Sequence, residues 1–356
     1  MRIVQTLVVR DEIDIVEAQI SYHLNAGVDF VIATDHESVD GTTEVLELFE
    51  RRGVLRRIPV SGPVHESVWR TNMARLAAAE HGADWLINTD ADEFWLPRSG
   101  SLKDVLAAVP ERYGVVWGLS RHFVPRPERE PWFADRMIVR VSAPASVNDP
   151  TSPFRPHAKV AHRADANITV GFGAHLVHDT PLRSLQHWPV ADVLHFPYRS
   201  IEQYERKGRR RARSDKRMAQ YVKALRASEG GRLEEVYASL FVDDAALDRG
   251  LAAGTLVVDT RLRETLRAIH VGPPAPASGA ASGSGSDLKV EASRRIAEAA
   301  ALREADIVRV QRRLDGLSVR LGAVERHAWA RPRHRAASSG REWTVRSRRI
   351  TEARTL

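Results

Sequence analysis

Two aspartates separated by a single residue follow a short apolar segment that predicts a buried strand. Residues 85–88 read Trp-Leu-Ile-Asn, and Asp90-Ala91-Asp92-Glu93 follows after one further residue. Aspartates at this spacing can turn toward one point where the chain leaves the extended conformation, and their oxygens suit Mg²⁺ or Mn²⁺ bound together with substrate phosphates. Such a cation neutralises the charge that develops on a diphosphate leaving group. A solvated turn could carry the same triplet, but its position after an apolar strand favours a metal site.

A second polar loop, residues 35–42, also follows a predicted strand and opens a predicted helix. Asp35 at the strand tip could accept a hydrogen bond from a nucleobase or a ribose hydroxyl. Ser38 or Asp40 could instead cap the helix, with Gly41 relieving the turn. Both interpretations can hold for different residues of the same loop.

These loops need a scaffold that brings them together, and the first hundred residues supply one. Apolar, β-branched runs lie at 3–9, 28–33, 54–60 and 85–88, and helical patterns lie between them at 13–26, 42–51 and 68–79. This alternation predicts a parallel, doubly wound α/β sheet, in which ligands bind beyond the carboxyl ends of the strands. The polar clusters at 10–12, 35–40 and 90–93 each follow a strand, so we expect them to face one crevice.

The remaining chain predicts a second half of the core and then a helical extension. Short strands are expected at 115–119, 137–141 and 193–196, a basic helix at about 201–228, and further helical sequence to 269. We therefore expect one core over 1–272, with a nucleotide-binding half at about 1–120, a half at about 121–220 that completes the metal and acceptor sites, and a helical part at 221–272. Residues 273–286, rich in Pro, Ala, Ser and Gly, predict a flexible linker.

Beyond the linker, apolar residues spaced alternately three and four apart predict a helix over 287–327. It is a candidate coiled coil, through which the chain could form a homo-oligomer. The Arg-rich tail, 328–356, predicts disorder.

Composition limits the class of protein. The chain has 356 residues and no cysteine, which excludes disulfides, zinc–thiolate sites and cysteine nucleophiles. No apolar stretch approaches the roughly 18 residues that span a bilayer, and the N-terminus does not read as a signal peptide, so we expect a cytoplasmic protein. The formal net charge is +7, but the tail contributes +6 of it, so the body is close to neutral. The basic balance therefore gives no indication of nucleic-acid binding.

A dense basic run occupies residues 206–213. It could be a solvated helix face beside a phosphate site, or a peripheral contact with anionic lipid at the inner face of the membrane. No aromatic residues are interleaved with it, which argues against nucleic acid.

Several motifs occur in an order and spacing that resemble the family 2 glycosyltransferases, in particular a bacterial subgroup with a D-x-D-E-F motif. They are Val9-Arg10-Asp11-Glu12, residues 22–28, Asp35 with Ser38 and residues 40–42, Asp90-Ala91-Asp92-Glu93-Phe94, Gly171-Phe172-Gly173-Ala174-His175, and residues 195–200 with Gln203, Tyr204 and Lys207. The resemblance covers about residues 1–218. It implies a GT-A fold, meaning a Rossmann-like mixed sheet with flanking helices, here with a C-terminal helical extension. It also implies hexosyltransferase-like activity with a nucleotide-diphosphate sugar donor (commonly UDP-linked), a divalent metal, a saccharide or lipid-linked acceptor and usually inversion at the anomeric carbon.

The resemblance also implies roles for individual residues. Asp92 matches the metal-ligating carboxylate, Asp90 the carboxylate nearer the ribose and the metal, and Asp35 the residue near the base. His195 corresponds to a late metal ligand, and neutral imidazole suits Mn²⁺. We expect its ring within roughly 4–8 Å of the Asp92 carboxylate. Arg199 and Lys207 on the following helix would grip the diphosphate.

The general base that deprotonates the acceptor stays open among Glu93, His175 and Asp179. Lys159 is interpreted as an exposed strand lysine, and His122 as structural. Two departures from the family pattern are Arg-Asp-Glu at 10–12 in place of Arg-Asn-Glu, and Gly-Ala-His at 173–175 in place of Gly-Asn-His. The second leaves the acceptor role of that loop in question.

Two other functions compete with glycosyl transfer. A sugar nucleotidyltransferase also uses an α/β sheet and metal-binding carboxylates, but no Gly-rich, Lys-containing phosphate loop follows the first strand. A non-catalytic adaptor that oligomerises through its C-terminal helix would not need the intact Asp90 and Asp92.

Overall fold

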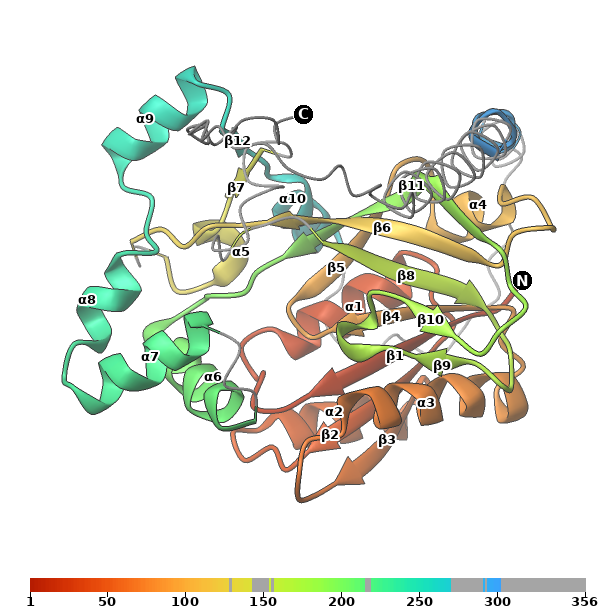
Figure 1. The fold of residues 1–356 in the computed structure, drawn as a ribbon, viewed down its shortest axis with the longest axis horizontal. Helices are drawn as coiled ribbons and strands as arrows, with labels where there is room; N and C mark the ends of the chain where they lie inside the picture. Colours follow the sequence, from red (N-terminus) through yellow and green to blue (C-terminus); the bar gives the residue numbers. More distant parts are fainter. Residues whose placement is uncertain are drawn as a thin grey trace, which may run out of the picture. The chain divides into compact units, whose positions relative to one another are not determined.

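The computed structural model describes residues 1–127, 130–142, 154, 157–214, 219–269, 291 and 293–301. The first part of the chain alternates strands and helices, as expected (Figure 1). Its elements are β1 Ile3–Val9, α1 Val16–Asn25, β2 Phe30–His36, α2 Thr42–Arg51, β3 Leu55–Val60, α3 Glu66–Glu80, β4 Trp85–Asp90, β5 Glu93–Pro97 and α4 Leu102–Ala107.

The second part contains shorter elements and then helices. They are β6 Val115–His122, α5 Phe133–Arg136, β7 Val139–Val141, β8 Ala158–Arg163, β9 Thr169–Val170, η1 Phe172–Ala174, β10 Val177–His178, β11 Ser184–His195, α6 Ile201–Ser214, α7 Ala219–Glu229, α8 Leu233–Ala238, α9 Asp244–Ala252, β12 Leu256–Val258 and α10 Arg261–Ala268.

The main sheet has eight strands in the order β3-β2-β1-β4-β8-β6-β11-β5. Strands β3, β2, β1 and β4 are parallel, which confirms the doubly wound arrangement of the first half. Strand β8 runs antiparallel to both β4 and β6, while β11 is parallel to β6 and antiparallel to β5. The fold is therefore α/β with a mixed sheet flanked by helices, as predicted.

Side chains of β1 alternate between two cores, as the pleat of a strand requires. Ile3 and Leu7 belong to the core that includes Phe49 of α2, whereas Val4 packs in the core that includes Met73 of α3. Helices α2 and α3 therefore cover opposite faces of the sheet. The sheet is held from both sides, and its strand ends stay in fixed positions.

The register of the sheet decides which polar residues meet. Val9 of β1 pairs with Asp35 of β2, and Val8 pairs with Asp90 of β4, so these strand ends lie along one edge. Toward the other edge of the sheet, His195 of β11 pairs with Glu93 of β5 and with His122 of β6. The backbone N–H of Phe196 donates to the carbonyl of Asp92 at 2.9 Å and joins the two ends of the site.

The basic segment after β11 forms two helices rather than the single helix predicted over 201–228. Gly208 of α6 lies against Ala224 of α7, where an added Cβ would sit 2.7 Å from the Ala224 Cβ. Tyr198, Tyr204 and Tyr237 form a small core of their own beneath these helices. Among the described residues, no helix combines the length and apolar character needed to cross a bilayer.

A helical segment after the predicted linker packs on the core. Ser293 Oγ lies 2.8 Å from Ser99 Oγ, Tyr113 Oη donates to the carbonyl of Ala301 at 3.5 Å, and Ala301 is buried. Residues 293–301 accordingly pack on the core, although they follow the boundary expected at 272. The predicted linker, most of the candidate coiled coil and the basic tail lie outside the described residues.

Candidate active site

A pocket of about 180 Å³ opens at the carboxyl ends of β1 and β4. Most of the candidate site residues predicted from the sequence line this pocket. They come from the acidic cluster, from β11, from α6 and from the turn after β9. They are Asp90, Asp92, Glu93, His175, His195 and Lys207. The structure thus brings together side chains separated by more than a hundred residues in the sequence.

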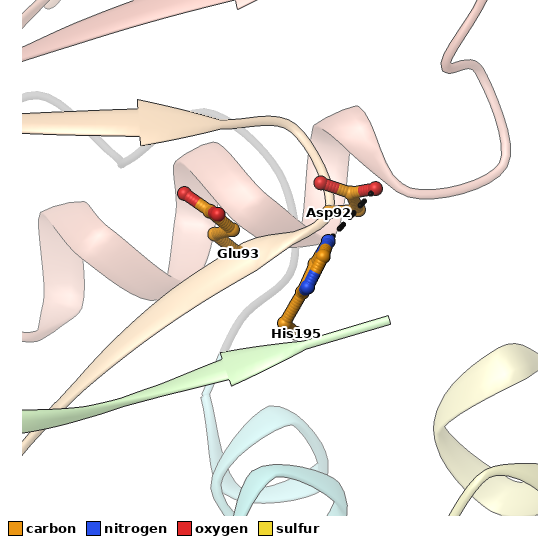
Figure 2. Close-up of side chains that lie close together, drawn as sticks. All are labelled: Asp92, Glu93 and His195. Carbon is orange, nitrogen blue, oxygen red and sulfur yellow. Dashed lines mark ion pairs between the residues drawn. The ribbon is translucent and has the colours of Figure 1, made fainter. Parts of the chain in front are cut away.

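Asp92 and His195 face each other across the pocket (Figure 2). His195 Nε2 lies 3.4 Å from Asp92 Oδ2, which confirms the predicted proximity and is closer than expected. Ligand atoms of Asp92, Glu93 and His195 all lie within 4.8 Å of one another. One imidazole nitrogen and two carboxylate oxygens are a suitable donor set for Mn²⁺. Their role as ligands stays a prediction.

Asp92 is surrounded by cations. Lys207 Nζ lies 2.6 Å from Asp92 Oδ2, and Arg199 Nη1 lies 4.0 Å from the same oxygen. Burial opposes ionisation of Asp92, but Lys207, His195 and Arg199 outweigh it and hold its pKa well below the usual range. The carboxylate is therefore charged at any physiological pH.

Asp90 has different partners, and both of its oxygens are engaged. Arg70 of α3 donates to Oδ1, and Lys159 of β8 donates to Oδ2 at 2.8 Å. Arg70 is fully buried and also donates to Glu66 at 3.1 Å and to the carbonyl of Thr89 at 3.0 Å. Burial opposes ionisation of Asp90 too, but the two cations lower its pKa.

The interpretation of Lys159 as an exposed strand lysine was wrong. Its side chain is 3% exposed and bridges Asp90 to Glu93, whose Oε1 lies 2.8 Å away. The other oxygen of Glu93 accepts the backbone N–H of Asp90 at 3.1 Å. Burial raises the pKa of Glu93 against the opposing effect of Lys159. Lys159 lies on a strand in the middle of the sheet, where both faces are covered.

Arg199 lies behind the pocket, and its guanidinium is fully buried. It donates to Glu12, to both oxygens of Asp14 at 2.6 and 2.9 Å, and to the carbonyl of Phe196 at 3.0 Å. These bonds use four of the five N–H donors of the guanidinium, and the buried side chain does not line the pocket where a diphosphate would bind. The expected grip of Arg199 on the donor does not fit this geometry, and Arg199 instead ties β11 to the loop after β1.

Asp35 is likewise buried within its loop and does not line the pocket. It accepts from the Thr43 hydroxyl at 2.6 Å and from Arg57 at 3.4 Å. Gly41 occupies the N-cap position of α2 with a φ of +103°, and Asp40 accepts from the N–H and hydroxyl of Thr42. Most contacts of this loop therefore agree with the interpretation in which its residues cap α2 and shape the turn.

Histidine rings line one wall of the pocket. His195 Nδ1 is 2.9 Å from His122 Nδ1, the His122 and His157 ring centroids are 5.2 Å apart, and those of His157 and His175 are 5.4 Å apart. His122, interpreted as structural, thus lines the pocket and contacts a predicted ligand. Asp179 is exposed and lies outside the pocket lining, so it does not fit the role of general base.

His175 is held in one orientation. Its Nδ1 lies 2.8 Å from the carbonyl of Ala158, which can only accept, so Nδ1 carries the hydrogen and Nε2 the lone pair. Burial and the nearby Lys159 cation lower the pKa of His175. The ring is therefore neutral near pH 7 and can accept a proton.

A wider hollow of about 650 Å³ adjoins the pocket. The two share a wall made by the loop after β1, the end of β2, the loop after β3 and α6. Its members are Arg10, Glu12, His36, Val64, Lys207 and Arg210. Gln203, Arg206, Lys207 and Arg210 recur at helical spacing and form one stripe of α6. Within the pocket, the His36 and Trp69 ring centroids lie 4.8 Å apart. The hollow is thus lined by basic side chains of α6 on one side, and the aromatic rings of His36 and Trp69 lie close to it.

Comparison with known proteins supports a glycosyltransferase as the general class of protein. Residues 4–135 match the sequence model of glycosyltransferase family 92, a segment that includes the acidic cluster but covers less than half of the chain. No curated protein matched the chain.

Solved structures that resemble the chain do so only distantly. S. aureus TarS 1-349 is 14% identical with a TM-score of 0.31, covering 60% of this chain and 66% of that chain. TarS 1-349 in complex with UDP gives the same identity and TM-score over 75% of this chain and 90% of that chain. A putative glucose-1-phosphate thymidylyltransferase from Bacillus anthracis is 7% identical with a TM-score of 0.26, covering 36% of this chain and 58% of that chain. The chain spans less than two thirds of the first and third of these structures, and likenesses this distant assign no function.

Proposed function

We propose that this protein is a metal-dependent glycosyltransferase that transfers a sugar, with inversion, from a nucleotide-diphosphate donor (a UDP-sugar in our proposal) to a hydroxyl acceptor. The observation that carries the proposal is the convergence of Asp92, Glu93 and His195 in a pocket that Lys207 and Arg210 also line. The family 92 match over residues 4–135 supports the class of reaction. The D-x-D-E-F resemblance to family 2 is consistent with it.

A divalent cation fits this site by charge as well as by donor type. In the described part of the chain, six carboxylates and four permanent cations form two groups of ion pairs around the pocket. The carboxylates are Glu12, Asp14, Glu66, Asp90, Asp92 and Glu93, and the cations are Arg70, Lys159, Arg199 and Lys207. Each group has one more carboxylate than cations, and a divalent cation would offset this excess; Arg10 and Arg210, which also line the pocket, are not part of these pairs. Burial removes water from the carboxyl groups of Glu12 and Glu93 and raises their pKa values, while the neighbouring cations lower them.

Asp92 and His195 would hold the cation, with Glu93 as the third candidate ligand. Asp90 and Glu93 are the weaker candidates, because Arg70 and Lys159 already engage the oxygens of Asp90, and Lys159 and the Asp90 N–H engage those of Glu93. The bound cation would supply Lewis-acid neutralisation of the diphosphate. Lys207, a flexible side chain on the pocket wall, would leave Asp92 and donate to the diphosphate instead.

The donor would extend across both hollows. A pocket of about 180 Å³ is small for a whole nucleotide-sugar, whereas ligand sites commonly measure about 300–1,000 Å³. We place the nucleoside in the 650 Å³ hollow, near the His36 ring, and the transferred sugar in the pocket. The diphosphate would then lie at the shared wall, within reach of Lys207 and Arg210. Asp35 would shape the loop that holds the base rather than contact it.

His175 is our choice for the general base. In the transfer, the acceptor hydroxyl gives its proton to His175 Nε2, and its oxygen forms a bond to the anomeric carbon. The bond from that carbon to the phosphate oxygen breaks, and its electron pair leaves with the nucleoside diphosphate. Glu93, the other candidate, has one oxygen on Lys159 and the other on a backbone N–H, so it is poorly placed to receive a proton.

The test is slow donor hydrolysis by the purified full chain. The protein is incubated with a panel of UDP-, GDP- and dTDP-sugars and Mn²⁺, and the products are identified by chromatography. Release of nucleoside diphosphate and free sugar that EDTA abolishes is expected. Formation of sugar phosphate with a nucleoside triphosphate, when pyrophosphate is added, would identify a nucleotidyltransferase instead. Nucleotide binding without turnover would favour the adaptor.

Two variants sharpen this test. Asp92→Asn should reduce turnover by at least a hundredfold, in line with several kcal/mol of lost charge stabilisation. Asp179→Asn, an exposed aspartate outside the pocket, is the matched control and should behave as wild type. Equal loss in both variants would contradict the assignment of the site.

A further inference from the structure

Phe172 is a large aromatic side chain that stays 51% exposed while lining the pocket. Rings of this size usually bury most of their surface, because each offers a large apolar area. Phe172 begins the short turn η1, and the two residues after it, Gly173 and Ala174, are buried. Within η1, only the Phe172 side chain is therefore exposed, and it points away from the core.

The turn is anchored, and its backbone is strained. Gly173 has a φ of +63° and Ala174 a φ of +53°, and a non-glycine residue in this left-handed region costs roughly 1–2 kcal/mol. Ala174 is nevertheless fully buried in the core beneath α3, and its N–H donates to the carbonyl of Gly171 at 3.1 Å. Packing therefore holds an unfavourable backbone conformation at the pocket edge.

His175 ends the same turn, three residues after Phe172, and its side chain lines the same pocket. A Cβ added to Gly173 would lie 2.6 Å from His175 Nε2, so only glycine leaves room for the ring at this position. The His157 ring lies next to the His175 ring. Phe172, His157 and His175 all line the pocket, and we call these three side chains the aromatic wall.

The aromatic wall lies away from the nucleotide side of the site. The residues that the pocket shares with the 650 Å³ hollow come from the loop after β1, the end of β2, the loop after β3 and α6, and none of the aromatic wall is among them. A donor whose nucleoside occupies the hollow would leave this wall for the second substrate. None of its three side chains carries a permanent charge, and the pKa of His175 is lowered.

We propose that Phe172 is the stacking platform for the acceptor, and that the acceptor is a neutral sugar ring that lays its C–H face on the Phe172 ring. This inference rests on the proposed function and adds the chemistry of the second substrate. A pyranose has an apolar face that suits an aromatic surface, and its hydroxyls suit the neutral imidazoles of His157 and His175. The reacting hydroxyl would thereby lie next to the base.

The experiment compares Phe172→Ala, Phe172→Trp and Leu176→Ala. Leu176 is the control because it lies in the same loop and is 42% exposed but does not line the pocket. Binding of methyl glucosides, methyl galactosides and methyl N-acetylglucosaminides is measured by saturation-transfer NMR in the presence of UDP and Mn²⁺, with glycerol as a probe that has no ring. Affinity for UDP is measured in parallel.

Phe172→Ala should weaken binding of the preferred methyl glycoside roughly 3- to 10-fold, the range expected for one lost aromatic contact. Phe172→Trp should restore it, Leu176→Ala should match wild type, and UDP affinity should stay the same in all three. The proposal is overturned if wild type binds no methyl glycoside, if glycerol binds equally well, if Phe172→Ala retains binding, or if it loses UDP affinity, which would assign the ring to the base.

These readouts need no turnover, so the two proposals can fail separately. Methyl glycoside binding that depends on Phe172, in a protein that hydrolyses no donor, would remove the proposed transferase and keep the sugar platform.

Discussion

Replacing Lys159 with methionine removes one buried cation and keeps a similar side-chain length. Lys159 Nζ lies 2.8 Å from Asp90 Oδ2 and 2.8 Å from Glu93 Oε1, and the side chain is 3% exposed. Glu93, whose side chain is 2% exposed, would then lose this cation, whereas Asp90 would keep Arg70. Removing one partner of a buried ion pair costs about 3–5 kcal/mol, because the remaining charge has no compensation. Against a total stability of about 5–15 kcal/mol, this is a large loss.

The loss should also depend on pH, and its sign follows from Glu93. Burial already raises the pKa of Glu93, and losing Lys159 would raise it further. A carboxyl whose pKa is higher in the folded state than in the unfolded state favours the folded state at low pH and opposes it as pH rises. The destabilisation caused by Lys159→Met should therefore be larger at pH 8 than at pH 5.

The matched control is Lys103→Met. Lys103 Nζ lies 2.6 Å from Asp29 Oδ1, so the contact is equally short, but the two side chains are 40% and 30% exposed. Pairs of this kind contribute about 0–1 kcal/mol. Free energies of unfolding for both variants and wild type come from urea titrations at pH 8 and pH 5.

The reasoning is refuted if Lys159→Met costs no more than Lys103→Met at both pH values. Should Lys159→Met fail to fold, the double variant Lys159→Met/Glu93→Gln also removes the charge of the carboxylate that lost its cation. It should recover measurable stability if the account is right.

Three further predictions follow from other contacts. Burial lowers the pKa of His23 to about 4 and that of His162 to about 4, from an ordinary value of 6.5, so stability should be present above pH 6.5 and be lost as pH falls toward 4. Each histidine accounts for on the order of 3 kcal/mol of this loss in the free energy of unfolding. In urea titrations from pH 7 to pH 4.5, the free energy of unfolding of His23→Gln and of His162→Gln should therefore fall less steeply than that of wild type. His195→Ala should raise the Mn²⁺ concentration needed for half-maximal UDP release without changing UDP affinity at saturating metal, and an unchanged metal requirement would remove His195 from the ligand set. Truncation after Gly272 should leave a folded core that binds UDP but unfolds at a lower temperature, because residues 293–301 cover Tyr113, whereas truncation after Glu304 should cost less.

The sequence was sufficient to predict the strand-end clusters because they depend on local patterns. Alternating strands and helices place Asp90 at a strand end, and the motif around His195 places it at another. The closeness of Asp92 and His195 followed from a general property of such sheets, namely that ligands collect beyond the carboxyl ends of the strands.

The partners of these residues could not be predicted, because they arrive through tertiary packing. Arg70 comes from α3 and Lys159 from β8, and no spacing relates either of them to Asp90. Glu66 and Arg70 form an i, i+4 pair on α3, but the helix predicted from the sequence began only at residue 68 and did not include Glu66. Lys159 was taken for an exposed side chain because a lysine in a short strand usually is, whereas β8 is inserted between β4 and β6. Arg199 was assigned to the donor for a similar reason, since its engagement by Glu12 and Asp14 depends on a contact across almost two hundred residues.

Asp90 and Asp92 are one residue apart, yet they belong to two separate groups of charges. Asp90 is held by Arg70 and Lys159, both buried, and any exchange of partners there would strand a charge in the core. Asp92 is held by Lys207, whose long side chain reaches it from α6 along the pocket wall. Only the second arrangement can be exchanged at low cost, since Lys207 can turn toward solvent or toward a phosphate while Asp92 accepts a new cation. For that reason we assign the metal to Asp92 and His195, and treat Asp90 as the fixed carboxylate that keeps the end of β4 in place.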